Sequence, residues 1–113
     1  MIDFLRADRP VNLAAADLSP PGRLLMLAPH PDDFDVVAVT LRRFQQTGWR
    51  LHVAVLTGGA AGVEGPEPPA AKAARREVEQ RDSARRFGLP DEQLEFLRLT
   101  EDDGGELADL PAN

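Results

Sequence analysis

The sequence predicts an α/β fold built on a parallel sheet, and the order of its apolar segments supports this. Apolar runs typical of buried strands occur at residues 24–28, 51–57 and 94–99. Segments with apolar residues at helical spacing, 35–47 and 70–87, lie between these runs. Because strands alternate with helices, right-handed crossovers are expected to join the strands into a parallel sheet. The predicted fold is therefore Rossmann-like, with three strands and two helices.

The first strand follows a leader formed by residues 1–22. This leader ends in Ser-Pro-Pro-Gly, which blocks regular structure directly before the strand. From Leu24 to Ala28 the chain is apolar without alternation, a pattern typical of a parallel strand that is covered on both faces. Pro29 then ends the strand.

Glycines mark the ends of both predicted helices. The first helix runs from Asp35 to Thr47 and stops at Gly48, and the second runs from Ala70 to Phe87 and stops at Gly88. The acidic stretch 100–113, after the last strand, has no periodic segment. Three strands and two helices leave the sheet's edges and faces open. We therefore expect a C-terminal half that is missing from this chain, or another subunit of a homo-oligomer, to cover the sheet.

The composition narrows the functional class. The chain has 113 residues, of which 42% are hydrophobic and 28% charged, as in one soluble globular domain. The absence of cysteine excludes a disulfide framework, a thiolate zinc site and a cysteine nucleophile. A net charge of −6 argues against nucleic-acid binding. No apolar stretch approaches the ~20 residues of a membrane span, and the N-terminus does not read as a signal peptide, so a cytoplasmic protein is expected.

Residues whose side chains commonly bind metal ions cluster between the first strand and the first helix. His30, Pro31, Asp32 and Asp33 come directly after the strand, at the carboxyl edge of the sheet, where open α/β sheets bind ligands. One imidazole and two carboxylates can place a nitrogen and an oxygen on a divalent ion and leave a third group to act on bound water. The alternative is that Asp33 or Asp35 caps the helix while His30 fills a turn. Four such residues at this junction favour the metal site.

The run LMLAPHPDD, from Leu25 to Asp33, resembles the strand and metal motif of the LmbE-like (PIG-L) de-N-acetylases. The later VAVLTGG strand is similar to the family's next strand, and the segment from Arg76 to Leu89 is similar to its R-x-x-E and A-x-x-L-G pattern. Asp103 and Gly104 resemble the acidic loop that follows. The resemblance covers residues 23–104, and the HPDD junction is its most specific part.

This resemblance implies a zinc-dependent hydrolase that removes an N-acetyl group from a small, amino-sugar-like substrate. His30 and Asp33 would bind Zn²⁺, and Asp32 would be the general base that takes a proton from zinc-bound water. Residues 1–22 would be the leader, and 23–113 the N-terminal portion of a deacetylase domain whose C-terminal half is missing. The residues implied on the substrate side are Gly58, Gly59, Arg76 and Asp103.

Two departures from the family pattern bear on the site. Phe34 stands where many members have Glu, so either the metal is oriented differently or Asp35 substitutes for that Glu. The family also takes a zinc-ligating histidine from its C-terminal half, and His52 lies about 16 Å from the expected site, at ~3.3 Å for each strand residue. Loop carboxylates could supply the missing oxygen, or a partner chain could supply the ligand; the loop candidates are Glu64, Glu67, Asp102 and Asp103.

Two other functions compete with the enzyme. A catalytically incomplete Rossmann-like binding or interaction module would explain the missing third ligand and Phe34. A nucleotide or phospho-ligand domain would use the glycines at 58, 59 and 62, although the G-x-G-x-x-G spacing of phosphate-binding loops is absent.

Overall fold

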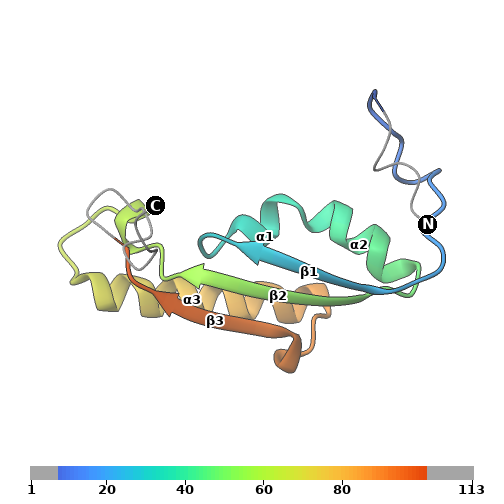
Figure 1. Ribbon diagram of the computed structural model, residues 1–113. Helices are drawn as coiled ribbons and strands as arrows, with labels where there is room; N and C mark the ends of the chain where they lie inside the picture. Colours follow the sequence, from blue (N-terminus) through green and yellow to red (C-terminus); the bar gives the residue numbers. More distant parts are fainter. Residues whose placement is uncertain (1–7, 102–113) are drawn as a thin grey trace, which may run out of the picture.

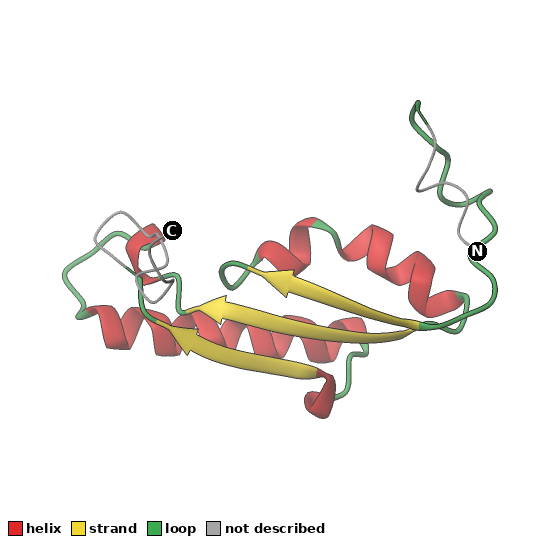
Figure 2. Ribbon diagram, in the orientation of Figure 1, coloured by secondary structure: helices red, strands yellow, loops and turns green. Residues whose placement is uncertain are grey.

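The computed structural model describes residues 8–101, which form one three-stranded parallel sheet with helices packed on it (Figure 1). The strands are β1 (Arg23–Ala28), β2 (Arg50–Thr57) and β3 (Leu94–Leu99), in the order β1-β2-β3. The two main helices are α2 (Ala38–Gln46) and α3 (Pro69–Phe87). Shorter helical turns are α1 (Asp33–Val36), η2 (Ala60–Gly62) and η3 (Asp91–Gln93). The predicted α/β fold with three parallel strands and two main helices is confirmed (Figure 2).

The first predicted helix is divided in two. Val37, with φ −109° and ψ 12°, leaves helical geometry and separates α1 from α2. The helical region also begins at Asp33, two residues before the predicted start. The second helix begins at Pro69, because proline is favourable in a helix's first turn, and ends at Gly88, whose φ of 90° continues the chain out of the helix.

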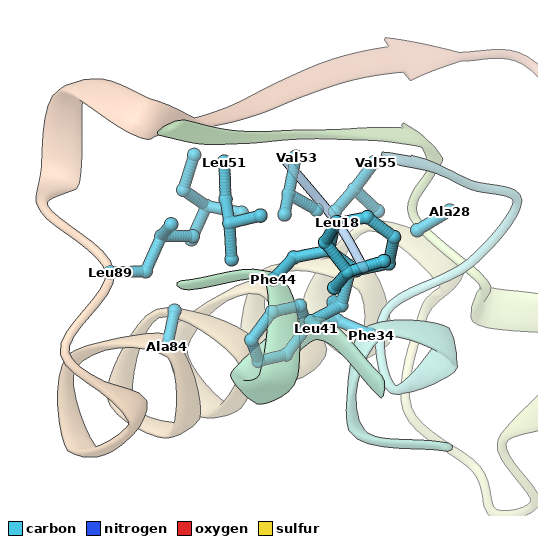
Figure 3. Packing of buried hydrophobic residues seen from close by; sticks show 11 residues of the cluster. Leu18, Ala28, Phe34, Leu41, Phe44, Leu51, Val53, Val55, Ala84 and Leu89 are labelled. Carbon is cyan, nitrogen blue, oxygen red and sulfur yellow. The ribbon is translucent and has the colours of Figure 1, made fainter. Parts of the chain in front are cut away.

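One face of the sheet carries the core. Alternate residues of β2 point into it and meet side chains of both main helices (Figure 3). Since both helices lie on the same face and the strand order is sequential, the two crossovers have the same hand, as the right-handed rule requires. The buried residues at this interface include Leu41, Phe44, Leu51, Val53, Val55 and Ala84.

The opposite face of the sheet is open over the described residues. Leu25 and Leu27 of β1 are 59% and 57% exposed, and Leu97 of β3 is 44% exposed. The prediction that β1 is covered on both faces is therefore wrong for residues 8–101. The physical reason is the topology: two crossovers of one hand place both helices on one face, and nothing in this range packs on the other.

Part of the predicted leader packs against the core although it has no helix or strand. Leu18 is buried, and its carbonyl accepts a hydrogen bond from Trp49 Nε1 at 2.9 Å. The Trp49 ring meets Phe44 edge to face, with ring centroids 5.2 Å apart. Arg43 of α2 donates to the carbonyl of Leu13 at 3.2 Å. The segment before β1 is thus attached to the end of α2.

No helix in the range 8–101 is long and apolar enough to cross a membrane.

A bulge at the end of β3 joins this strand to α3. Val55 pairs with Phe96, whereas Thr57 pairs with Leu99, so β3 contains one extra residue. Arg98 has a φ of 53° there, and it donates to the Glu77 carboxylate from Nε at 3.1 Å and from Nη2 at 2.6 Å. The Arg98 guanidinium lowers the pKa of Glu77, against the opposing effect of burial.

Because Glu77 has a lower pKa in the folded chain than in the unfolded chain, the pair stabilises the fold above the unfolded pKa and stops doing so as pH falls through the folded pKa. We expect Glu77→Gln to lower the free energy of unfolding at pH 7 by about 1 kcal/mol, since one partner is exposed. The difference should vanish in acid. Urea titrations from pH 7 downward measure it.

Asp82→Asn is the matched control, because Asp82 pairs with Arg86 at 3.0 Å on the same helix and both side chains are exposed. This variant should differ little from the wild type at either pH. A Glu77→Gln deficit that persists unchanged in acid would contradict the assignment to the Glu77 carboxylate.

Candidate functional site

The HPDD turn lies at the carboxyl end of β1, and the neighbouring strand fixes where it begins (Figure 1). Thr57, the last residue of β2, donates to the Pro29 carbonyl from its backbone N–H at 3.1 Å and from its hydroxyl at 2.9 Å. Thr57 is itself buried. The turn therefore starts from a defined point on the sheet, at the edge where the sequence predicts the site.

His30 and Asp33 face each other across the turn. The backbone N–H of His30 donates to Asp33 Oδ2 at 2.8 Å, and His30 Nδ1 lies 3.8 Å from the same oxygen. A separation of 3.8 Å is too long for a hydrogen bond between the side chains. About a third of each side chain is exposed, so both groups are open to solvent.

These two groups are suited to a zinc ion. Zinc binds imidazole nitrogen at about 2.0–2.1 Å and carboxylate oxygen at about 2.0–2.2 Å. The sum of the two bond lengths exceeds the 3.8 Å between His30 Nδ1 and Asp33 Oδ2, so both atoms are close enough to contact one ion. Over residues 8–101 no group of three His, Cys, Asp or Glu side chains could hold a metal. The described residues thus offer two ligands, and the zinc site stays a prediction.

Asp32 has a backbone conformation that is uncommon for a residue other than glycine, with φ 86° and ψ −22°. Its N–H donates to Gln80 Oε1 at 2.7 Å, and its Oδ2 lies 3.2 Å from Arg76 Nη2. Its side chain is 69% exposed. Within the described range nothing donates to Oδ1, which leaves this oxygen available to accept a proton.

Arg76 joins the HPDD turn to the loop after β2. One side of its guanidinium donates to the Gly59 carbonyl, and the other donates to the Pro31 carbonyl at 2.6 Å and pairs with Asp32. The side chain is largely buried. Arg76 therefore has three protein partners at the rim of the site.

The two glycines after β2 lie close to side chains of α3. A Cβ on Gly58 would lie 2.6 Å from Ala73 Cβ, and a Cβ on Gly59 would collide with the Arg76 guanidinium. Gly59 also has a φ of 64°. Three of the four predicted substrate-side residues, Gly58, Gly59 and Arg76, thus lie beside the turn, and Asp103 falls outside the described residues.

Two residues that sequence reasoning did not select also contact this region. Gln80 follows Arg76 by one helical turn, and this i,i+4 spacing is a usable signal. Glu101 Oε1 accepts a hydrogen bond from the Gly59 N–H, and its Oε2 is buried with no partner in the described part of the chain. Glu101 lies in a stretch whose only sequence signal is its acidity.

The other candidate ligands lie away from the turn, except Asp102, which falls outside the described residues. His52 pairs in register with Leu25, well before the end of β1, and its Nε2 is 3.6 Å from Glu95 Oε2. Glu67 is paired with Arg75 at 2.5 Å, and Glu64 is exposed and has no contact with the turn within residues 8–101. None of these three is brought to His30.

Phe34 and Asp35 point in different directions from the turn. Phe34 is 1% exposed, and its ring meets Phe87 edge to face at 5.0 Å, so this position is part of the core. Asp35 accepts a hydrogen bond from the Ser83 hydroxyl of α3. It also borders a small cavity of about 110 Å³ that is lined by Pro31, Asp32, Asp35, Arg76, Glu79 and Gln80.

A much larger groove, of about 1000 Å³, runs between the first half of α3 and the end of β3. Gly58 and Glu101 line it, but His30, Asp32 and Asp33 do not. The groove thus reaches the rim of the candidate site but does not include the side chains that could bind a metal ion. The position of the turn, and not the size of the groove, defines the site.

Comparison with known proteins identifies the family and the fold of the chain. The PIG-L family model, described as GlcNAc-PI de-N-acetylase, matches residues 25–109, which is most of the chain. The N,N'-diacetylchitobiose deacetylase from Pyrococcus horikoshii, complexed with its inhibitor MPG, is 24% identical with a TM-score of 0.63; the match covers 88% of this chain and 37% of that one. The conserved protein TT1542 from Thermus thermophilus is 34% identical with a TM-score of 0.54, over 77% of this chain and 35% of that one.

This chain therefore spans little more than a third of the length of these two solved structures. No curated protein matches its sequence. The likeness to the Pyrococcus enzyme concerns the fold, whereas the family match covers the HPDD turn, the glycines after β2 and α3. On this match, the chain belongs to the PIG-L family of de-N-acetylases.

Proposed function

We propose that this chain carries the HPDD half of a zinc-dependent de-N-acetylase site that acts on an amino-sugar-like substrate. The observation that carries the proposal is the arrangement of the turn: two metal-ligand types face each other, and the neighbouring carboxylate of Asp32 extends into solvent with one oxygen free. Family membership supports the acetylated substrate.

His30 and Asp33 would hold the zinc ion. When bound, zinc would lower the pKa of a coordinated water and polarise the acetamide carbonyl. Asp32 Oδ1 would accept the proton of the attacking water, while Arg76 keeps Oδ2 in place. The water oxygen would add to the acetamide carbonyl carbon, and as the C–N bond breaks the leaving nitrogen would take up the proton from Asp32, which releases acetate and an amine. Gly58 and Gly59 would form the rim on which the substrate rests.

The remaining zinc ligands would come from outside residues 8–101, either from a C-terminal half of the same domain or from a partner chain. In this proposal, residues 23–113 form the N-terminal portion of the deacetylase domain, and the open face of the sheet is where the rest packs. The enzyme would be cytoplasmic.

The test measures zinc content, zinc affinity and acetate release together. Zinc is titrated at neutral pH, and acetate release is assayed with N-acetylglucosamine and N,N'-diacetylchitobiose. We expect His30→Ala to weaken zinc binding by at least about 100-fold, since it removes a direct ligand. His52→Ala is the matched control, because the second histidine lies beside Glu95 on the open face. Equal zinc affinity in His30→Ala and the wild type would exclude His30 as a ligand.

A second candidate function is a binding or interaction module without catalysis. It is favoured by the finding that residues 8–101 contain no third metal ligand. Absence of bound zinc and of acetate release, in a protein that is folded, would support this module over the enzyme.

A further inference from the structure

The backbone of Asp32 has to be held in place by its surroundings. A left-handed conformation is uncommon in a residue other than glycine, and neighbouring contacts are needed to hold it. The φ of Asp32 is 86°, and no side chain caps the N-terminus of α1 that it begins. Within the turn, the Asp32 carbonyl accepts the Asp35 N–H at 2.9 Å, whereas the Asp32 N–H is bound by another element.

Helix α3 supplies the restraint. Gln80 is 2% exposed, and its Oε1 accepts the Asp32 N–H at 2.7 Å. Because a backbone N–H requires an acceptor, this contact fixes which end of the Gln80 amide faces Asp32. The other end, Nε2, is buried and has no partner over residues 8–101.

A buried amide group without a hydrogen-bond partner normally destabilises a fold. A side chain selected only for packing at this position would not carry such a donor. The buried Nε2 of Gln80 is therefore unfavourable for stability, whereas Oε1 of the same side chain is the acceptor of the Asp32 N–H.

We infer that Gln80 is a positioning residue for Asp32, an inference that rests on the proposed function. Gln80 holds the peptide N–H of Asp32, and Arg76, one turn earlier on the same helix, holds Oδ2. With both ends of the residue attached to one rigid helix, the direction of the free Oδ1 is fixed. Gln80 itself touches no reacting atom.

Removal of the acceptor should therefore affect turnover more than substrate binding. In Gln80→Met the volume is retained and the Asp32 N–H loses its partner. We expect kcat for acetate release to fall by about 10- to 100-fold, because small displacements of a catalytic group have effects of this size. KM should change by less than about threefold. Gln80→Glu retains an acceptor oxygen and should recover most of the rate.

Ser83→Ala is the matched control. Ser83 also connects α3 to this region, through the Asp35 carboxylate, but it does not contact Asp32. Its kcat should remain within about twofold of the wild type. An unchanged kcat in Gln80→Met, or an equal loss in Ser83→Ala, would overturn the inference.

Hydrogen exchange tests the same idea without any assay of activity. Gln80→Met should speed exchange of the Asp32 amide by at least about tenfold, while the amide of Val53, in the core of β2, stays protected. Unchanged exchange at Asp32 would overturn the inference. If the wild type releases no acetate, the proposed function fails, and the exchange measurement still decides whether Gln80 holds Asp32.

Discussion

Asp32→Asn should abolish most deacetylation while leaving zinc binding intact. The substitution keeps the size of the side chain and its contact with Arg76 but removes the proposed proton acceptor. General-base catalysis contributes about 10²- to 10⁴-fold to rate. We therefore expect kcat to fall by about that factor, with zinc affinity unchanged. Steady-state kinetics of acetate release and zinc titration of the same preparation measure the two quantities.

Glu79→Gln is the appropriate control for this variant. Glu79 borders the same small cavity as Asp32, but it makes no hydrogen bond or ion pair with any residue between 8 and 101. It should behave as the wild type in both measurements. A fully active Asp32→Asn enzyme would remove Asp32 from the general-base role, and a zinc-free one would instead place Asp32 among the ligands.

Phe34→Ala should cause the largest loss of stability among single substitutions near the turn. The ring is buried against Phe87, and truncation of a buried Phe to Ala lowers the free energy of unfolding by about 3–5 kcal/mol through lost burial and the cavity left behind. Urea or guanidinium unfolding measures this change. Where Phe34→Ala is unfolded outright, Phe34→Leu gives a smaller loss that can still be quantified.

Val36→Ala serves as the control, because Val36 belongs to the same helix α1 and is 81% exposed. It should change stability by no more than about 0.5 kcal/mol. A small effect of Phe34→Ala would contradict the view that this position belongs to the core.

Local signals in the sequence were enough to predict the fold. Apolar runs and the glycines at 48 and 88 predict the strands and the helix ends to within a residue or two. The division of the first helix at Val37 was not predictable. Valine is compatible with a helix, and the break depends on the tertiary contacts of the HPDD turn. For residues 8–101 the prediction that β1 is covered on both faces was wrong. An apolar run shows that both faces of a strand are hydrophobic, but it does not show what packs on each face.

The candidate site was predictable only in part. The HPDD residues are consecutive, so the motif and its position after a strand locate them. The contact between Gln80 and Asp32 joins residues 48 positions apart and depends on the rotation of α3 against the sheet. The i,i+4 spacing places Gln80 and Arg76 on one face of α3, but it does not show which part of the molecule this face contacts.

The three attachments of Arg76 have a mechanical consequence. A single cation bridges the carbonyl of Gly59, the carbonyl of Pro31 and the carboxylate of Asp32, which belong to the loops after two different strands. One guanidinium therefore links the rim of the candidate site to the carboxylate that is proposed to take the proton. A ligand that displaced the Gly59 loop would lengthen a contact of the same group that holds Asp32.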